Sequence, residues 1–508
     1  MKAVLVVSLF LLLLAARALA NEVVFPVLRE VRVVPAVESE GITLKGVEAR
    51  LRAEFVGRPL AMADLEAMSE AVLSFYQKAG RPVTAVDFLP GEEEGVLEVV
   101  IREGRVGRVL TELPEHVNAG VIERGFRLKP GELLRQEALD EETAWLNRHP
   151  YRKAQLLASP GEGFGEADLL FRFSNPRPWR AFANYSNSGA RGLDLHRFSV
   201  GGSYWLPTDH VVQGQAIFGR SVDEFQAYSV GYEMPLHRWR QLVAVRLSWA
   251  SVESETASSV SGGESFRVEG AYTIPLSTSG GFEQALSFGF DSLQTDSFLF
   301  FLGTAFPSEE LQIVQGYLRY EASRKTESDR LDLKLGAYLH PGEWLGLTDE
   351  SAFASYDPEA ERNAFYVNGE ASYLRQLPED LSLLVRMRGQ VSPHRLFPSQ
   401  RMAFGATEGL RSFEPRSFLA DSGWNGSVEV RSPAWEWSEA QVQAGVFSDW
   451  GYLSFQKETA VEEDGEWQAA VGANLAMEWD GGFSLSISQG FSLEERGAFT
   501  SVSATWRF

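Results

Sequence analysis

The last two-thirds of the chain, from Trp179 to Phe508, alternate between apolar and polar residues with a period of two. In the run 330–339, leucines and one alanine fall on one side, while charged residues, a glycine and a tyrosine fall on the other. The same alternation occupies residues 228–234, 266–274 and 385–391. A period of two is that of a β-strand, and runs of about 10 to 12 residues suffice for a tilted strand to cross a bilayer. This pattern favours a membrane barrel over a soluble sandwich.

The connections between these runs alternate between tight turns and long polar loops, which is the asymmetry of an outer-membrane barrel. The turns fall at 206–209, 235–237, 376–380 and 480–482, and the loops at 252–264, 293–309, 341–362, 393–424 and 451–465. About sixteen runs fit the segment. The last run carries Trp506 on its apolar face and ends in the aromatic Phe508, a C-terminal strand signal of such barrels. The sequence therefore predicts a 16-stranded outer-membrane β-barrel over residues 177–508.

Residues 1–20 have the pattern of an export signal. Lys2 precedes an apolar stretch from Ala3 to Ala16, and Ala18-Leu19-Ala20 fits the small-x-small cleavage rule. The stretch is too short to span a bilayer comfortably. The mature chain is expected to begin at Asn21, outside the cytoplasm.

Two similar αβ modules separate the leader from the barrel, at residues 21–104 and 105–176. In the first, helical spacing at 44–55 and 65–75 lies between short strands near residues 28–34 and the strands 82–88 and 96–101. In the second, helices at 117–126 and 135–147 lie between strands at 106–110, 155–158 and 167–173. The β-α-α-β-β order occurs twice in tandem, which indicates a repeated binding or scaffold module.

The composition excludes several classes of function. There are 69 acidic and 47 basic residues, and loss of Lys2 and Arg17 with the leader takes the formal charge from −22 to −24. Such a chain lacks the basic face that nucleic acid requires. It has no cysteine, its histidines are scattered singly, and it shows no nucleotide loop, nucleophile elbow or metal-type histidine pair. We therefore predict no catalytic residue, no metal site, no cofactor and no enzyme activity.

Three stretches of the modules resemble the haemolysin secretion/activation (ShlB/FhaC/HecB) family of two-partner secretion transporters. They are Phe75–Val83, Val96–Val106 and Leu146–Lys153. The resemblance implies that both modules are POTRA domains, which the family holds in the periplasm to receive unfolded substrate. It covers nearly all of the mature chain.

The loop 393–424 carries the sharpest motif. Gly409-Leu410-Arg411-Ser412-Phe413 resembles the family's Val-Arg-Gly-Phe loop, with leucine in place of valine and Ser412 in place of glycine. Phe447-Ser448-Asp449 matches the family's Phe-x-Asp strand motif, and the resemblance implies that Arg411 folds into the lumen and pairs with Asp449. Independently, Asp449 shares the phase of Gln441, Gln443 and Phe447, which should face the lumen. An arginine inside a barrel needs a carboxylate to offset its desolvation. The alternative is a solvated Arg411 and one lumen carboxylate among many.

The resemblance implies a transporter that secretes an unfolded partner exoprotein, of adhesin or cytolysin type with an N-terminal secretion domain, without ATP. The expected setting is the outer membrane of a Gram-negative-type bacterium, with outer-membrane lipid around a monomeric barrel that the barrel-assembly machinery inserts. Few residues precede the first module, so we expect no plug helix and closure by the 393–424 loop alone. The alternative function is an assembly or insertion factor of the same superfamily. A passive porin needs no periplasmic modules, and is disfavoured.

Overall fold

The computed structural model describes residues 23–25, 27–35, 42–163, 165–174, 177–189, 194–255, 259–279, 281–296, 298–301, 304–307, 310–456, 465–494 and 497–508. The predicted leader at 1–20 lies outside these residues. The chain divides into two compact units. One takes the described residues before Glu115 together with those of 126–175, and the other takes 115–125 and the described residues from 176 onward. Among the described residues, no helix is long and apolar enough to cross a membrane.

The first module has the predicted β-α-α-β-β order. It consists of β2 (Glu30–Pro35), α2 (Lys45–Phe55), α3 (Met62–Lys78), β4 (Thr84–Pro90) and β5 (Val96–Glu103). The sheet runs β2-β5-β4, with β2 parallel and β4 antiparallel to β5. Two short strands that the sequence did not predict, β1 (Val23–Phe25) and β3 (Leu60–Ala61), pair with each other.

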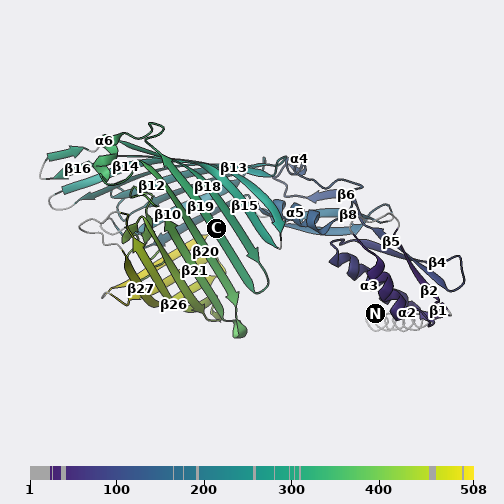
Figure 1. Ribbon diagram of the computed structural model, residues 1–508. Coiled ribbons are helices and arrows are strands. Elements are labelled where there is room, and N and C mark those ends of the chain that lie inside the picture. The colour runs from purple at the N-terminus through teal and green to yellow at the C-terminus, as the bar shows by residue number, and fades with distance from the viewer. Residues whose placement is uncertain are drawn as a thin grey trace, which may run out of the picture. The chain divides into compact units, whose positions relative to one another are not determined.

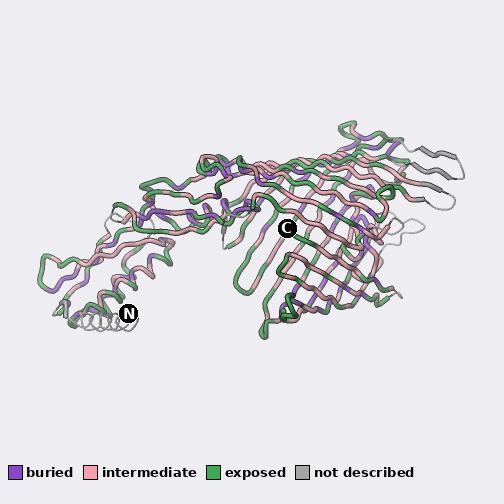
Figure 2. The backbone as a smooth tube through the Cα atoms, turned by 180° about the vertical axis from the view of Figure 1, so that it is seen from behind, coloured by how far each residue is buried: buried purple, intermediate pink, exposed green. Residues whose placement is uncertain are grey.

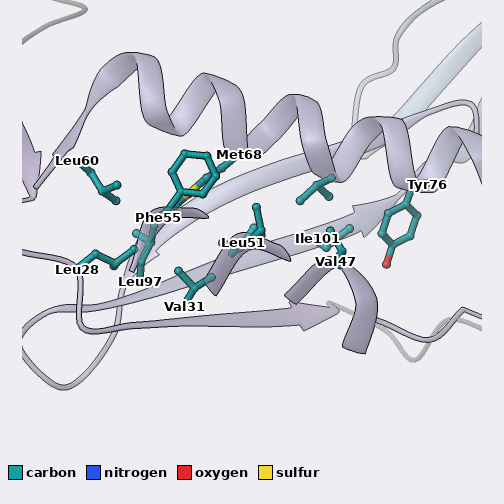
Figure 3. Packing of buried hydrophobic residues seen from close by; sticks show 12 residues of the cluster. Leu28, Val31, Val47, Leu51, Phe55, Leu60, Met68, Tyr76, Leu97 and Ile101 are labelled. Atoms are coloured by element: carbon teal, nitrogen blue, oxygen red, sulfur yellow. The ribbon is translucent and has the colours of Figure 1, made fainter. Parts of the chain in front are cut away.

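Helical spacing of apolar residues creates the core of this module (Figure 3). Val47, Leu51 and Phe55 recur along one face of α2, and Met68, Val72 and Tyr76 along one face of α3. All six are at most 3% exposed. They pack with Leu28, Val31, Leu97, Val99 and Ile101 from the sheet side of the module. Residues three or four apart share one helix face, so this face must be covered, and the sheet covers it.

The second module repeats the order with one shorter helix. It contains β6 (Arg105–Glu112), α4 (Ala119–Glu123), α5 (Gln136–Asn147), β7 (Ala154–Pro160) and β8 (Glu166–Phe173), in the sheet order β6-β8-β7. The prediction of a helix over 117–126 was too long. The Asn118 side chain accepts a hydrogen bond from the Gly120 N–H and starts α4, and the chain leaves the helix before Gly125.

The segment 115–125 belongs to the compact unit of the barrel. The Asn118 N–H donates to the carbonyl of Pro207, and the Arg240 guanidinium donates to the carbonyl of Gly125 at 3.0 and 3.2 Å. The His116 ring stands edge-on to Trp205. Two turns of the barrel, after Trp205 and after Leu236, therefore hold this segment through backbone groups that would otherwise lack partners.

The barrel is closed and antiparallel throughout (Figure 1). In the described part of the chain sixteen strands form its wall, as predicted: β9 (Trp179–Ser186), β10 (Arg197–Trp205), β11 (Val211–Phe218), β12 (Phe225–Leu236), β13 (Gln241–Glu255), β14 (Ser259–Ser279), β15 (Phe282–Thr295), β18 (Leu311–Lys325), β19 (Asp329–Pro341), β20 (Asn363–Gln376), β21 (Ser382–Val391), β24 (Ser422–Arg431), β26 (Ala440–Ser454), β27 (Glu466–Trp479), β28 (Phe483–Ser492) and β29 (Ala498–Arg507). β29 pairs with β9 and closes the ring.

The alternation of the sequence becomes an alternation of exposure along the strands (Figure 2). On β26 the side chain of Val446 is 63% exposed, whereas Phe447 and Asp449, in the opposite phase, are 5% and 0% exposed. Leu335 on β19 and Met387 on β21 are 55% and 53% exposed. Apolar residues therefore cover the outer face, and polar residues line the lumen.

Two predicted loops and one connection that the sequence analysis did not single out contain regular structure. The loop expected at 252–264 was wrong, because β13 and β14 continue through it as a paired hairpin, with Ser251 opposite Glu264 and Glu255 opposite Val260. The segment 293–309 carries a short hairpin of β16 (Phe298–Phe301) and β17 (Thr304–Pro307). A turn segment carries β25 (Trp435–Trp437), paired with β26.

The segment 341–362 holds a short helix, α6 (Glu350–Tyr356). Asp349 caps it by accepting hydrogen bonds from the N–H groups of Ser351 and Ala352. The Ser351 hydroxyl also donates to this carboxylate. That hydroxyl, together with the two N–H groups, holds the pKa of Asp349 below its usual value.

The assignment of faces predicts the effect of a single charge. Leu335→Arg places a guanidinium on the lipid-facing side near the middle of β19, and should destabilise the folded barrel by about 2–4 kcal/mol. Ser372→Arg, on the lumen face of β20 opposite Asp332, should be tolerated. Urea unfolding in lipid vesicles measures both, and equal stability of the two variants would contradict the face assignment.

Candidate functional site

The loop between β21 and β24 forms the candidate site. It contains a small hairpin of β22 (Met402–Phe404) and β23 (Phe418–Ala420), with the motif residues between these strands. Gly409 has φ of +102°, and a Cβ at that position would lie 2.8 Å from the Asn425 side-chain oxygen. Both the backbone angle and the close approach require glycine there.

Arg411 lies at the tip of the loop, and each of its guanidinium nitrogens donates a hydrogen bond to a residue of the barrel wall. Its Nε and Nη2 donate to the two oxygens of Asp449 at 3.0 and 2.7 Å, and its backbone N–H donates to Asp449 at 3.1 Å. Its Nη1 donates to Glu429 at 2.6 Å, and Nη2 also donates to the Ser427 hydroxyl at 2.7 Å. The structure therefore places Arg411 against Asp449, a partner 38 residues away, in a bidentate fork.

The ion pairs of Arg411 are buried, which makes the loss of a partner costly in free energy. The side chains of Asp449, Glu429 and Arg411 are 0%, 2% and 12% exposed. Arg431 also donates to Glu429, and Arg386, opposite Ser427 on the neighbouring strand β21, adds a third guanidinium near the same two carboxylates. The Arg411 guanidinium lies 3.3 Å from the centre of the Phe447 ring, in a cation–π contact. Loss of one partner would leave a buried charge without compensation.

Apolar residues on both sides of Arg411 fix the loop tip. Leu410 is fully buried in a cluster with Met402, Phe404, Ala420 and Leu453, and Phe413 packs against the same cluster. Ser412 is 2% exposed, and it is not among the residues with positive φ. The serine at the motif's glycine position is therefore compatible with the turn, because the left-handed conformation falls on Gly409.

Three glycines lie in the barrel wall beside the loop tip. A Cβ on Gly490 of β28 would collide with the backbone of Arg411 and Ser412, and one on Gly472 of β27 would collide with the Phe447 ring. A Cβ on Gly451 would lie 3.0 Å from Leu410. The loop backbone thus lies directly on strand backbone, which only glycine permits.

Sequence reasoning missed two partners of Arg411, Glu429 and Ser427. A signal existed, because Glu429 stands between Val428 and Val430 on β24 and therefore shares the lumen phase. Trp506 and Phe508 lie at the end of the chain with 52% and 60% exposure, and their role as an assembly signal stays a prediction. Among the described residues, no group of three or more acidic or histidine side chains is placed to hold a metal ion.

A closed barrel of this size, two β-α-α-β-β modules ahead of it and a loop packed in its lumen define an outer-membrane barrel protein of the POTRA-carrying class. The model of the haemolysin secretion/activation protein ShlB/FhaC/HecB family matches residues 165–475, more than half of the chain. The chain belongs to this family, and the outer membrane is its location.

Relatives agree with this assignment. The chain is 20% identical over 477 residues to the heme/hemopexin transporter protein HuxB of Haemophilus influenzae, covering 87% of this chain and 79% of HuxB. Among solved structures, CdiB from Escherichia coli superposes with a TM-score of 0.75 at 17% identity, covering 95% of this chain and 91% of CdiB. BamA from Haemophilus ducreyi, lacking POTRA domains 1–3, gives a TM-score of 0.56 at 12% identity, covering 95% and 100%. The two superpositions show a shared fold.

The glycine wall yields a test that leaves every charge in place. Gly490→Ala forces the loop tip away from β28, at a cost of about 1–3 kcal/mol to the packed position. The ion conductance of the purified protein in planar bilayers should therefore rise. Gly481→Ala, where a Cβ meets nothing within 4 Å, is the matched control. Equal conductance of the two variants would contradict the contact between the loop tip and this wall.

Proposed function

We propose that the protein secretes an unfolded partner exoprotein across the outer membrane without ATP, and that it is not an enzyme. The observation that carries this proposal is the loop tip held in the lumen by Arg411. A pore for a polypeptide must be closed at rest and open in use, and a loop bound by reversible ion pairs meets both requirements. Family membership supports the transport role, and HuxB is described as a transporter.

In this proposal Arg411 and Asp449 are the gating pair. Gly409, Leu410, Ser412, Phe413 and Phe447 shape the surface on which the pair forms. The lumen conducts the chain once the tip is released, and folding outside the cell draws the chain outward.

The modules would receive the substrate by adding a strand to a sheet edge. In the described residues β4 pairs only with β5, and β7 pairs only with β8, so each has one open edge. A groove of about 620 Å³ lies between the start of β4 and the end of β7, lined by residues 83–85, 158–163 and 165–167. Open edges offer unpaired backbone groups to an extended segment without demanding a particular sequence. This suits an unfolded cargo.

The proposed partners follow from this role. Besides the exoprotein, the barrel contacts outer-membrane lipid, and the barrel-assembly machinery reads the terminal strand with Trp506 and Phe508. We propose a monomer, since one closed barrel supplies one conduit.

A role in barrel assembly is the second candidate, and the likeness to BamA favours it. The two roles differ in what disappears when the protein is removed. Loss of a secretion transporter removes particular proteins from the medium, whereas loss of an assembly factor lowers the amounts of many outer-membrane barrels.

The gate is tested by Arg411→Ala. Removal of one partner from a buried ion pair costs about 3–5 kcal/mol, which would shift the balance between packed and released loop by about a hundredfold or more. Conductance in planar bilayers should rise from nearly closed to a large, steady pore, and deletion of 393–424 should reproduce it. Arg375→Ala, an exposed arginine near the end of β20, is the control. A wild-type protein as open as the variant would refute loop gating.

Substrate reception by the first module is tested by deletion of residues 25–103. This deletion keeps the segment 115–125, which belongs to the compact unit of the barrel. We expect the barrel to insert normally, as judged by heat-modifiable migration, while one or more proteins vanish from the culture medium. Quantitative proteomics of the medium and of the outer membrane reads both outcomes. Unchanged media would refute substrate reception by the first module, and a general loss of outer-membrane barrels would favour the assembly role.

A further inference from the structure

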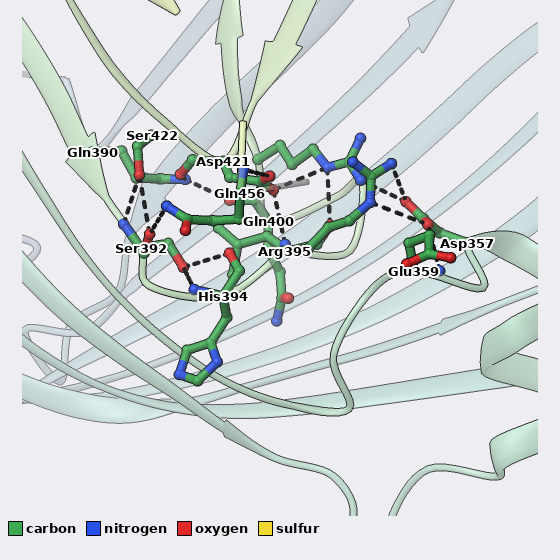
Figure 4. Close-up of polar contacts among 12 residues, drawn as sticks. Asp357, Glu359, Gln390, Ser392, His394, Arg395, Gln400, Asp421, Ser422 and Gln456 are labelled. Atoms are coloured by element: carbon green, nitrogen blue, oxygen red, sulfur yellow. Dashed lines mark hydrogen bonds and ion pairs between the residues drawn. The ribbon is translucent and has the colours of Figure 1, made fainter. Parts of the chain in front are cut away.

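The base of the loop 393–424 carries a second ionic cluster, separate from the one around Arg411 at the tip (Figure 4). Asp357, just after α6, accepts hydrogen bonds from Arg395 at 3.3–3.4 Å and from the Arg401 Nη2. The Arg401 Nε lies 3.3 Å from an oxygen of Asp421, at the other end of the loop. The cluster therefore joins both ends of the loop to the separate segment 341–362.

This cluster is buried. The side chains of Arg395 and Arg401 are each 5% exposed, that of Asp357 is 10% exposed and that of Asp421 is 0% exposed. Asp421 is already occupied by backbone donors, because it accepts from the N–H of Leu396 at 2.8 Å and of Gln456 at 3.1 Å. Asp357 is the carboxylate that both guanidiniums contact.

Further contacts tie the same two segments together. The Phe397 ring of the loop packs 5.2 Å from Phe353 of α6, in a cluster with Leu311 and Ile313 of β18. The Glu361 N–H donates to the carbonyl of Arg395 at 3.0 Å, and the Glu361 carboxylate lies 2.8 Å from the His394 ring nitrogen. The segment 341–362 thus supports the loop base through apolar, backbone and ionic contacts.

We infer that Asp357 is a positioning residue of the pore gate, which holds the base of the 393–424 loop so that its tip can reach Asp449. The inference rests on the proposed gating function and adds the segment 341–362 to the gate. Without the Asp357 charge, Arg395 and Arg401 lose the carboxylate that they share. Their repulsion moves the base, and the tip loses its fixed approach to the wall.

If closure of the pore depends on the base of the loop through its tip, the effects of losing both attachments on conductance should not add. The tip is held from β24 and β26 through Glu429 and Asp449, and the base is held from the segment 341–362 through Asp357. If the base positions the tip, its loss weakens the same closure that Arg411 provides. Removal of the Arg411 side chain already releases the tip, so a further loss of the Asp357 charge should raise the conductance little more.

The test is planar-bilayer conductance of the purified full chain carrying Asp357→Asn, which removes the charge and keeps the shape. We expect the open fraction to rise about tenfold, and Asp357→Glu should restore most of the closure. Glu350→Gln, which removes the same charge from an 81% exposed side chain of the same segment, should behave as wild type. Asp357→Asn with Arg411→Ala should conduct no more than Arg411→Ala alone.

The outcomes separate the two ideas. If Arg411→Ala leaves the pore closed, the proposed gating function falls whatever Asp357 does. If Arg411→Ala opens the pore while Asp357→Asn matches Glu350→Gln, the gating function stands and the positioning role is overturned. A double variant that conducts far more than Arg411→Ala would also overturn it, because the two attachments would then act independently.

The absence of native cysteine offers a second variant if Asp357→Asn fails to insert. Phe353→Cys with Phe397→Cys can be joined by a short thiol crosslinker in a chain that also carries Arg395→Gln. Arg395→Gln alone should raise conductance, and the crosslink should lower it again by holding the base. A crosslink without effect on that raised conductance would refute positioning through this segment.

Discussion

Closure of the strand ring is the constraint on which the rest of the structure depends. No water is available in hydrocarbon to satisfy a backbone N–H or C=O, so strands span a membrane only when their last edge meets their first. Here β29 meets β9 over five residue pairs, from Ser503–Ser186 to Arg507–Phe182. Side chains extend this short seam. Asn184 donates to the carbonyl of Ala504, and Asn187 exchanges hydrogen bonds with Val502 and Thr500.

A closed ring of strands encloses a lumen, and a charged side chain that is buried there needs a partner of opposite charge. An arginine that enters the lumen loses bulk water and must find carboxylates with good geometry. Arg411 finds Asp449 and Glu429, and Arg401 finds Asp357 and Asp421. In each cluster a buried guanidinium contacts two buried carboxylates. The loop is therefore a folded part of the barrel, bound at its tip and at its base, and it is held by interactions that a small change in charge can break.

Much of this architecture could be read from local pattern. The period-two runs predicted sixteen strands, and the helical stripes predicted both modules, because both periodicities reflect which face of an element is buried. The phase of β26 placed Asp449 in the lumen without any knowledge of the loop. Local pattern gave the wrong structure at 252–264. The serines and glycines there are typical of a loop, but β13 and β14 remain paired with each other in this segment. Local pattern also overestimated α4, where the capping residue decided the length.

The sequence alone determined the approximate number of strands, the faces of the runs that alternate clearly and the lumen phase of Asp449, whereas the pairing of Asp449 with Arg411 was implied by the resemblance to the family. The former properties are periodic or local, and each is set by neighbours along the chain. Only the tertiary structure decided that Glu429 shares Arg411, that glycines form the wall beneath the loop tip, and that Asp357 binds the loop base. Asp357 and Arg401 are 44 residues apart, and no periodicity links them. Their meeting depends on the path of two loops, which is fixed only when the closed barrel brings the strand ends together.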